Sequence, residues 1–348
     1  MSKQQKAVLV KEIGKPIVLG ETNIPIPADD EVLVKVAATM LLPHDAYGRD
    51  WGLFIENKLP AVLGSNIAGK IDQVGRNVTK FRKGDKVFGL ANPGKPDNGQ
   101  AGLQTYSTLP STAIARIPEG FTAEQVVTLP VNLVTSFQAL FTKSSGFGFK
   151  HGAEKSVGAA DQTLVIIGAG AVVGKFAIQL AKFAGIGKII AIAGSDSENE
   201  LKKMGATYVV DRRLSQEAIV GQVHSITGKD SVTNIYECRS MSYELAANLL
   251  AEGKKTRLVT VHPADKNPSV VAAKRPDAEM NFIEGSSENL GELEGVFWRD
   301  VGGWLKDGWM LPAKFSVVEG LDKVDEMNAA LDGYMAGTGG PQLVVKLA

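Results

Sequence analysis

The sequence predicts an α/β protein of two domains, one mostly β and the other built on a doubly wound parallel sheet. Three observations lead to this prediction: an alternation of apolar strands and helices over residues 163–261, a glycine-rich turn within it, and strand and turn patterns in the first 125 residues. Apolar strands that alternate with helices are typical of a parallel sheet covered on both faces. We place the mostly β domain at residues 1–125 and 290–348, and the parallel-sheet domain at 126–289.

The mostly β domain is expected to consist of short strands separated by turns. Strands are expected at 32–37, 66–74 and 86–90, because these runs are rich in β-branched and apolar residues and are bounded by glycine-containing turn signals. The tail from about residue 289 carries two amphipathic helices. It ends in the run 342–347, which is typical of a strand that returns to the first domain.

The second domain is expected to open with two helices. Thr122 followed by Gln125 is the pattern of a capping box, so one helix should begin there, and another is expected over 133–141. The glycine-rich stretch 144–160 is interpreted as a surface loop. Further strands are expected at 163–167, 188–192, 208–210, 234–238 and 257–261, and further helices at 174–184 and 198–204.

The composition excludes several classes of protein. The 348 residues include 38 Lys and Arg against 38 Asp and Glu, so no overall attraction to nucleic acid or to an anionic membrane is expected. The single cysteine, Cys238, rules out an intrachain disulfide and a zinc site of several thiolates, and we expect it to be a buried thiol. Without a signal-peptide pattern or a run of about 18 uncharged apolar residues, we expect a cytoplasmic protein with a small-molecule substrate.

The glycine-rich turn is the most informative segment. It follows an apolar strand and opens a helix, which is the context of a dinucleotide-binding turn. Gly168 would permit the tight turn, Gly170 the close approach of a pyrophosphate, and Gly174 the close packing of helix and strand. The backbone amides near Val172 and Val173 would then face the phosphates. A plain strand-to-helix turn is the alternative.

The preferred cofactor depends on the end of the second strand of this domain. Enzymes that use NAD normally place an Asp or Glu there to bind the ribose 2′-hydroxyl, whereas this chain has small neutral residues followed by Ser195. A carboxylate would repel a 2′-phosphate, so its absence favours NADPH, although Asp196 lies one residue beyond. Arg212, after the third strand, is either a ligand of that phosphate or a solvated surface arginine.

Longer motifs resemble a known family. The glycine-rich stretch 63–89, the segment 168–185 and the run 202–206 are similar to three motifs of the medium-chain dehydrogenase/reductase superfamily. The resemblance covers Lys6 to the end and implies a GroES-like catalytic domain with a Rossmann domain, and also a homodimer. The chain is most similar to the zinc-free branch, which contains quinone oxidoreductases, enoyl reductases and CipB-like fungal oxidoreductases, and residues 51–57 and 129–141 resemble the CipB-like group.

The zinc ligands of the alcohol dehydrogenases in this superfamily are missing. Their Gly-His-Glu element reads Gly64-Ser65-Asn66, and neither Ser nor Asn is a usual zinc ligand. His44 and Asp45 are adjacent, and adjacent side chains seldom chelate one ion, so we expect no metal. Without a Lewis acid, a hydride is expected to pass to a carbon that is already electrophilic, in an enone or a quinone.

The resemblance also implies roles for residues around the nicotinamide. Tyr47 is expected to contact the substrate or donate a proton, with a packed tyrosine as the alternative, and Arg49 to contact substrate or serve as an ion-pair partner. Thr135 is expected beside the nicotinamide ribose and phosphates, or packed in a helix. Val261 and His262 are expected near the carboxamide, with a plain loop histidine as the alternative.

Together these observations predict an NADPH-dependent, zinc-independent reductase. It would transfer a hydride to an activated C=C bond or to a quinone, with the cofactor at the carboxyl ends of the parallel strands and the substrate near Tyr47. Two alternatives stay open. One is a carbonyl reductase or dehydrogenase of a specialised biosynthetic pathway, and the other is a nucleotide-binding protein with little catalytic turnover.

Overall fold

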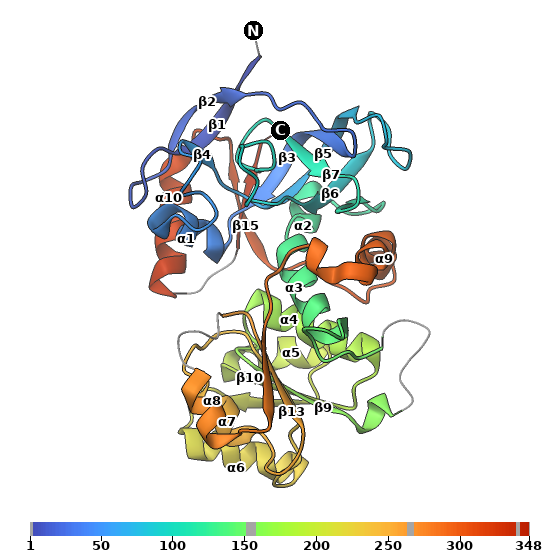
Figure 1. The fold of residues 1–348 in the computed structure, drawn as a ribbon, viewed down its shortest axis with the longest axis vertical. Coiled ribbons are helices and arrows are strands. Elements are labelled where there is room, and N and C mark those ends of the chain that lie inside the picture. The colour runs from blue at the N-terminus through green and yellow to red at the C-terminus, as the bar shows by residue number, and fades with distance from the viewer. Residues whose placement is uncertain (1–2, 151–157, 263–267, 339–341, 348) are drawn as a thin grey trace. The chain divides into compact units, whose positions relative to one another are not determined.

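The chain folds into two compact units, each with its own sheets and core (Figure 1). Unit 1 comprises Met1–Val131 and Gly291–Ala348, and unit 2 comprises Asn132–Leu290. Unit 1 is mostly β and unit 2 contains a parallel sheet, which confirms the predicted fold class. The computed structural model describes residues 3–150, 158–262, 268–338 and 342–347.

Unit 1 contains two sheets. The smaller is antiparallel, with the order β2-β1-β4, and the larger has the order β15-β16-β3-β5-β6-β8, with β7 also paired to β3. The smaller sheet consists of β1 (Gln4–Val10), β2 (Val18–Asn23) and β4 (Ala61–Val62). The larger consists of β3 (Glu31–Met40), β5 (Asn66–Val74), β6 (Lys86–Leu90), β7 (Tyr106–Pro110), β8 (Ile114–Arg116), β15 (Phe315–Glu319) and β16 (Gln342–Lys346).

The two ends of the chain meet within unit 1. Strand β16 pairs antiparallel with β3, with Val345 opposite Thr39, so the last strand returns to the first domain as predicted. An apolar core lies between β1, β4 and the helices α1 (Pro43–Trp51) and α10 (Val324–Ala336). The remaining helices of this unit are α2 (Ala123–Val126) and α9 (Glu294–Lys306), and the 3-10 segment η4 (Glu288–Leu293) spans the boundary of the two units.

The predicted capping box at the start of α2 is confirmed. The N–H of Gln125 donates to the Oγ1 of Thr122, and the N–H of Thr122 donates to the Oε1 of Gln125. Two donors that the helix itself leaves unpaired are thereby satisfied.

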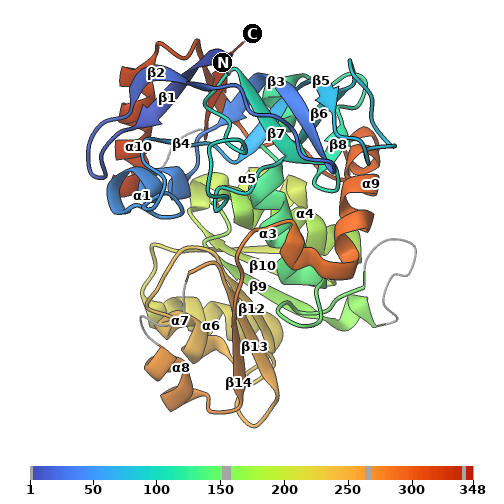
Figure 2. The ribbon, with the colours of Figure 1, turned by 45° about the horizontal axis from the view of Figure 1, so that its top comes forward.

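Unit 2 is built on six parallel strands in the order β11-β10-β9-β12-β13-β14. Figure 2 labels β10, β9, β12, β13 and β14 of this sheet. Continuous apolar runs in the inner strands explain this arrangement, because both faces of the sheet are covered. The strands are β9 (Thr163–Ile167), β10 (Lys188–Ala193), β11 (Tyr208–Asp211), β12 (Asn234–Glu237), β13 (Thr256–Thr260) and β14 (Ala278–Phe282).

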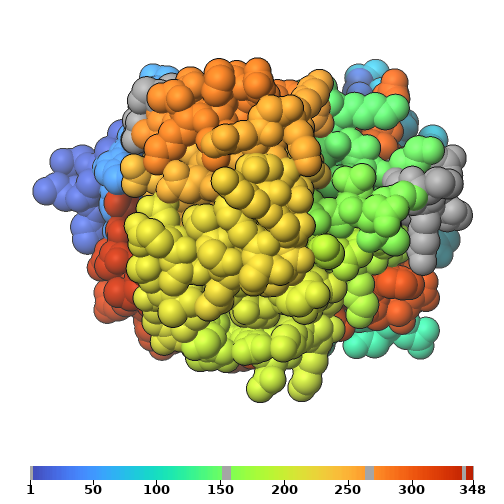
Figure 3. Space-filling model, turned by 90° about the horizontal axis from the view of Figure 1, so that it is seen from below, coloured from blue at the N-terminus to red at the C-terminus, as the bar shows by residue number. Residues whose placement is uncertain are grey.

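Helices cover both faces of the parallel sheet. Alternate residues of β9 and β10 pack with α6, α7 and α8 in one apolar cluster, and α4 contacts the same two strands from the other side (Figure 1). The outer surfaces of α6 and α8 form the face of unit 2 seen from below (Figure 3). The helices are α3 (Pro130–Phe141), α4 (Val172–Ala184), α5 (Glu198–Met204), α6 (Gln216–Thr227), α7 (Glu244–Leu249) and α8 (Pro268–Lys274).

Part of the loop expected at 144–160 lies outside the described residues, at 151–157. At its end, Ala159–Asp161 forms a short 3-10 helix, η1. Within the described ranges, no helix is long and apolar enough to cross a membrane.

Candidate active site

The carboxyl edge of the parallel sheet gathers the predicted cofactor residues of unit 2. Gly168 follows β9, Ser195 follows β10, and Val261 and His262 follow β13. Strand β9 lies between β10 and β12, so the chain leaves β9 at the point where the strand order reverses. Ligands of doubly wound sheets bind at this kind of switch point.

The three glycines of the turn meet different constraints. Gly168 has φ +77°, and a Cβ there would lie 2.6 Å from the Cβ of Arg239. A Cβ on Gly174 would lie 2.7 Å from the Cα of Ala169, so helix α4 approaches the end of β9 closely. A Cβ on the exposed Gly170, however, would meet no atom nearer than the Cβ of Ala193, at 3.7 Å. The fold therefore requires glycine at the first and third positions and leaves space at the second.

Helix α4 begins without a side-chain cap. Its N-cap is Ala171, which has no acceptor for the amides of Val172 and Val173. Helix α3 lies against this start, because the Ser136 hydroxyl donates to the Val173 carbonyl at 2.7 Å, and the buried Thr135 is its neighbour. An open helix N-terminus that follows a glycine turn fits the pyrophosphate of a dinucleotide.

An arginine that sequence reasoning missed lies beside Ser195. The guanidinium of Arg213 donates to the Ser195 Oγ at 2.7 Å and to the Asp196 carboxylate at 2.9 Å, and it also pairs with Asp211. The predicted Arg212 instead uses its backbone N–H, which donates to the carbonyl of Ala193. The signal was present in the sequence, since Arg213 is adjacent to Arg212 in the turn directly after β11, which ends at Asp211.

Glu237 and Cys238 are buried at the end of β12. Glu237 is 1% exposed, and its Oε1 accepts the N–H groups of Arg239 and Ser240. Burial raises the pKa of Glu237 to about 7, against the lowering effect of these two hydrogen bonds. Burial also raises the pKa of the Cys238 thiol, which is buried as expected from the sequence.

His262 is held by the backbone at the end of β13. Its N–H donates to the Thr260 hydroxyl, and its carbonyl accepts from Tyr243. Burial lowers the pKa of His262, and the positive charge of Arg239 lowers it further. The neutral imidazole is therefore favoured at this edge.

In unit 1, Asp45 fixes the start of α1. Its two carboxylate oxygens accept the N–H of Leu42 at 2.8 Å and the N–H of Gly64 at 2.9 Å. Burial raises the pKa of Asp45, while His44 and the two backbone donors lower it. The carboxylate therefore joins the first turn of α1 to the segment that enters β5.

Tyr47 and Arg49 differ in their surroundings. The ring of the half-buried Tyr47 stacks on Trp51, with centroids 4.9 Å apart and planes 8° apart. The guanidinium of Arg49 is 6% exposed and pairs with Asp50 and with Asp332 of α10. These contacts match the ion-pair role that the sequence left open for Arg49.

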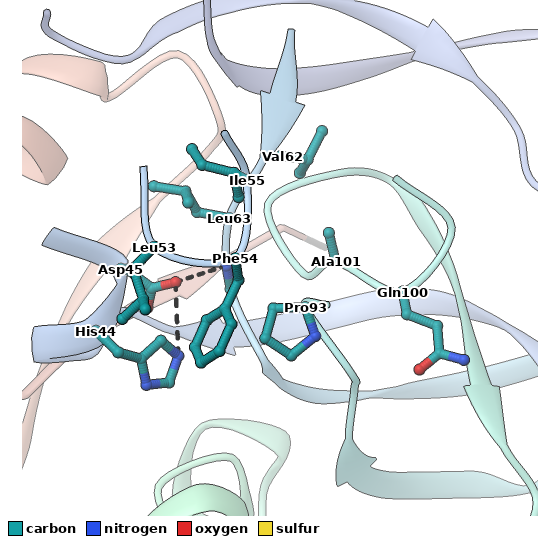
Figure 4. Close-up of a pocket in the computed structure, with 11 residues that line it drawn as sticks. His44, Asp45, Leu53, Phe54, Ile55, Val62, Leu63, Pro93, Gln100 and Ala101 are labelled. Carbon is teal, nitrogen blue, oxygen red and sulfur yellow. Dashed lines mark hydrogen bonds and ion pairs between the residues drawn. The ribbon is translucent and has the colours of Figure 1, made fainter. Parts of the chain in front are cut away.

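A small, open pocket lies beside the start of α1 (Figure 4). His44 lines it, and the His44 Nε2 lies 2.9 Å from the Oγ of the buried Ser65. The ring of Phe54 stands edge-on to the imidazole of His44 on another side of this pocket. Its further lining residues are Asp45, Leu53, Ile55, Val62, Leu63, Gly64, Pro93, Gln100 and Ala101.

The donor set at the zinc positions of alcohol dehydrogenases does not fit zinc. Asn66 uses its amide within the protein, since its Nδ2 donates to the Val127 carbonyl and its Oδ1 accepts the N–H of Val131. Ser65, its neighbour, is a poor zinc ligand. In the part of the chain that the structure describes, no three His, Cys, Asp or Glu side chains gather as a metal site.

Comparisons with known proteins agree with this arrangement. Residues 28–138 match the family model "Alcohol dehydrogenase GroES-like domain", and residues 172–281 match "Zinc-binding dehydrogenase". Among curated proteins, the trans-enoyl reductase tndF of Aspergillus flavipes is 31% identical over 238 residues, which cover 67% of this chain and 66% of that protein. The dehydrogenase orsE of Emericella nidulans is 27% identical over the full length of both chains.

Solved structures show the same fold. The quinone oxidoreductase of Coxiella burnetii superposes with a TM-score of 0.75 at 22% identity, and the match covers 99% of this chain and 100% of that one. The first model falls mainly in unit 1 and the second within unit 2, in the order that the resemblance implied. The chain belongs to the medium-chain dehydrogenase/reductase superfamily and is an oxidoreductase of that type, which uses a nicotinamide cofactor.

Proposed function

We propose that this protein is an NADPH-dependent reductase that acts without zinc on an activated C=C bond or a quinone. The observation that carries the proposal is that two features occur in the same chain. The dinucleotide turn from Gly168 to Gly174 is intact, and Ser65 and Asn66 occupy the positions of the zinc ligands in alcohol dehydrogenases. The enoyl reductase among its relatives supports the same class of reaction.

The residues of unit 2 would hold the cofactor, which supplies a hydride when bound. The open space at Gly170 and the uncapped amides of Val172 and Val173 suit its pyrophosphate. Ser195 and Arg213 suit a ribose 2′-phosphate, and Arg212 adds a second positive charge nearby. Arg213 is paired with the carboxylates of Asp196 and Asp211, which partly neutralise its charge. When the cofactor binds, its 2′-phosphate would therefore have to replace a carboxylate as the partner of Arg213.

The substrate would meet the residues of α1. Tyr47 presents a ring stacked on Trp51, which suits contact with a flat conjugated substrate. Thr135, Val261 and His262 would surround the nicotinamide, the first from α3 and the other two from the end of β13. A substrate activated by conjugation does not need a metal, because its own carbonyl accepts the electrons that the hydride displaces.

NADPH oxidation with matched acceptors tests this proposal. We expect turnover with 2-cyclohexenone or 1,4-benzoquinone and none with cyclohexanone, which lacks the conjugated bond. Gly170→Asp should abolish NADPH binding, because it places a carboxylate where the pyrophosphate approaches. Reduction of cyclohexanone alone would instead indicate a carbonyl reductase. NADPH binding without turnover on any acceptor would indicate a nucleotide-binding protein that is not an enzyme.

We also propose that the protein is a cytoplasmic homodimer. Strand β14 forms one edge of the parallel sheet of unit 2 and offers a place where a second copy could continue the sheet. Light scattering during gel filtration should give twice the mass of one chain. A proline at Met280, within β14, should shift the protein to a single chain.

A further inference from the structure

His44 is anchored on one side and open on the other. Its Nε2 lies 2.9 Å from the Ser65 Oγ and 3.9 Å from the Asp45 Oδ1. Ser65 and Asp45 are 1% and 2% exposed, whereas the side chain of His44 is 23% exposed. A buried hydroxyl and a buried carboxylate thus hold one ring nitrogen of a histidine whose ring borders a pocket.

The wall of this pocket is built from an uncommon backbone conformation. Phe54 has φ +66°, which bulky side chains rarely adopt, and its ring stands edge-on to the imidazole with centroids 6.3 Å apart (Figure 4). Strain of this kind persists only where surrounding structure holds it, and it concentrates at ligand sites. Phe54 and its neighbour Leu53 are each 39% exposed, so the wall presents apolar surface to a ligand.

The partners of His44 assign different roles to its two nitrogens. In the protonated ring both nitrogens carry hydrogen, and the Nε2–H then donates to the Ser65 Oγ, with the Asp45 Oδ1 3.9 Å away. Among the described residues, the Nδ1 atom has no hydrogen-bond partner. When the ring is protonated, Nδ1–H is therefore the proton that is free to leave, and the ring returns to a neutral form that Ser65 still holds.

We propose that His44 is the acid that protonates the reduced substrate, and that Ser65 is its positioning residue. This inference rests on the reductase function proposed above. A hydride adds to the β-carbon of an α,β-unsaturated carbonyl compound, and the π electrons of the C=C bond move to give an enolate. The Nδ1–H bond of the His44 imidazolium then breaks, its proton forms the new bond of the saturated product, and solvent restores the proton.

Tyr47 is less suited to this step. Proton loss from Tyr47 would leave a phenolate, and among the described residues no cation pairs with its hydroxyl. Proton loss from the His44 imidazolium leaves a neutral ring. Tyr47 and His44 lie three residues apart on α1, so they share one side of the helix, and Tyr47 serves as a contact residue.

Two matched acceptors separate proton delivery from hydride transfer. Reduction of 2-cyclohexenone gives an enolate that needs an acid, whereas reduction of 1-nitrocyclohexene gives a nitronate, which is stable without one. We expect His44→Gln to lower kcat/KM for the enone by at least about 100-fold. The same variant should reduce the nitroalkene at about the rate of the unchanged protein and release nitronate, which is measured by its ultraviolet absorbance. Retained nitroalkene turnover also shows that the variant folds and binds NADPH.

Three further variants complete the test. Ser65→Ala should lower kcat for the enone by a smaller factor and leave the nitroalkene unaffected, which a general loss of stability could not do. Tyr47→Phe should change both acceptors alike, and His224→Gln, on α6, should change neither. The proposal for His44 is overturned if His44→Gln reduces the enone at the unchanged rate, or if Tyr47→Phe loses enone reduction but keeps nitroalkene reduction. Either result leaves the proposed reductase function standing. If the unchanged protein reduces neither acceptor, the reductase function itself is wrong and this inference falls with it.

Discussion

The carboxylate of Asp45 accepts the N–H of Gly64 at 2.9 Å and so ties the first turn of α1 to the segment that enters β5. Its other oxygen accepts the N–H of Leu42, where α1 begins. One buried side chain thus fixes the helix that carries His44 and Tyr47 against the segment that carries Ser65.

Asp45→Asn should destabilise unit 1. An amide offers one oxygen where the carboxylate offers two, so its NH₂ group would face a backbone N–H that also donates. We expect the free energy of unfolding to fall by about 1–3 kcal/mol, the usual cost of a buried group left unsatisfied. Chemical denaturation at pH 7 measures this loss. Asp277→Asn, at an exposed position, is the control and should change stability little.

Glu237 should make stability depend on pH. Its pKa rises from 4.5 to about 7 on folding, so between these values the folded protein binds more protons than the unfolded chain. The free energy of unfolding therefore decreases as pH increases through this window, by about 3 kcal/mol in total. Glu237→Gln keeps an oxygen for the N–H groups of Arg239 and Ser240 and should remove this decrease. Denaturation at pH 5 and pH 8 compares the two proteins, and an equal pH dependence in both would contradict the assignment to Glu237.

Arg213 should determine the preference for NADPH. Its guanidinium lies against Ser195, whereas the backbone N–H of Arg212 donates to the carbonyl of Ala193. Loss of a charge-assisted contact with the 2′-phosphate should weaken NADPH binding by about 10- to 100-fold. Arg213→Ala should leave NADH binding nearly unchanged, and Arg212→Ala should have the smaller effect on NADPH. Fluorescence titration of each protein with NADPH and with NADH measures these affinities, and tighter binding of NADH by the unchanged protein would refute the NADPH assignment.

The glycines of the turn should separate stability from binding. Gly174→Ala places a Cβ 2.7 Å from the Cα of Ala169, so thermal unfolding should occur at a lower temperature. Gly170→Ala meets no atom within 3.7 Å and should leave the unfolding temperature unchanged while it weakens NADPH binding. Equal binding of NADPH by Gly170→Ala and the unchanged protein would show that the pyrophosphate does not approach this residue closely.

Much of the fold could be predicted because its signals are local. The runs at 66–74, 86–90 and 163–167 became β5, β6 and β9 with the predicted bounds, since β-branched and apolar residues lie between clear turn signals. Helix α1 was missed because its glycine and its many polar residues weaken the helical pattern. Strand β2 was missed because its alternation of exposed and half-buried residues includes few apolar side chains.

The candidate site was only partly predictable, for a different physical reason. The glycine turn could be located because the roles of its three glycines depend on the geometry of the backbone within a few residues of one another. The contact between His44 and Ser65 joins residues 21 positions apart, and nothing in either local sequence indicates that the imidazole meets that hydroxyl. Residue type does not distinguish Arg212 from Arg213, and only the turn after β11 decides which of these two adjacent arginines reaches Ser195.

The sequence by itself therefore determined the superfamily, the two-domain architecture, the dinucleotide turn and the replacement of zinc ligands by Ser65 and Asn66. These features depend on residue type and on short-range spacing. Only the tertiary structure decided that Arg49 is held in ion pairs, that Arg213 meets Ser195 and that His44 is anchored by Ser65 beside a pocket. Those contacts depend on how strands and helices far apart in the sequence pack together, because packing determines which polar groups are buried and which partners remain to satisfy them.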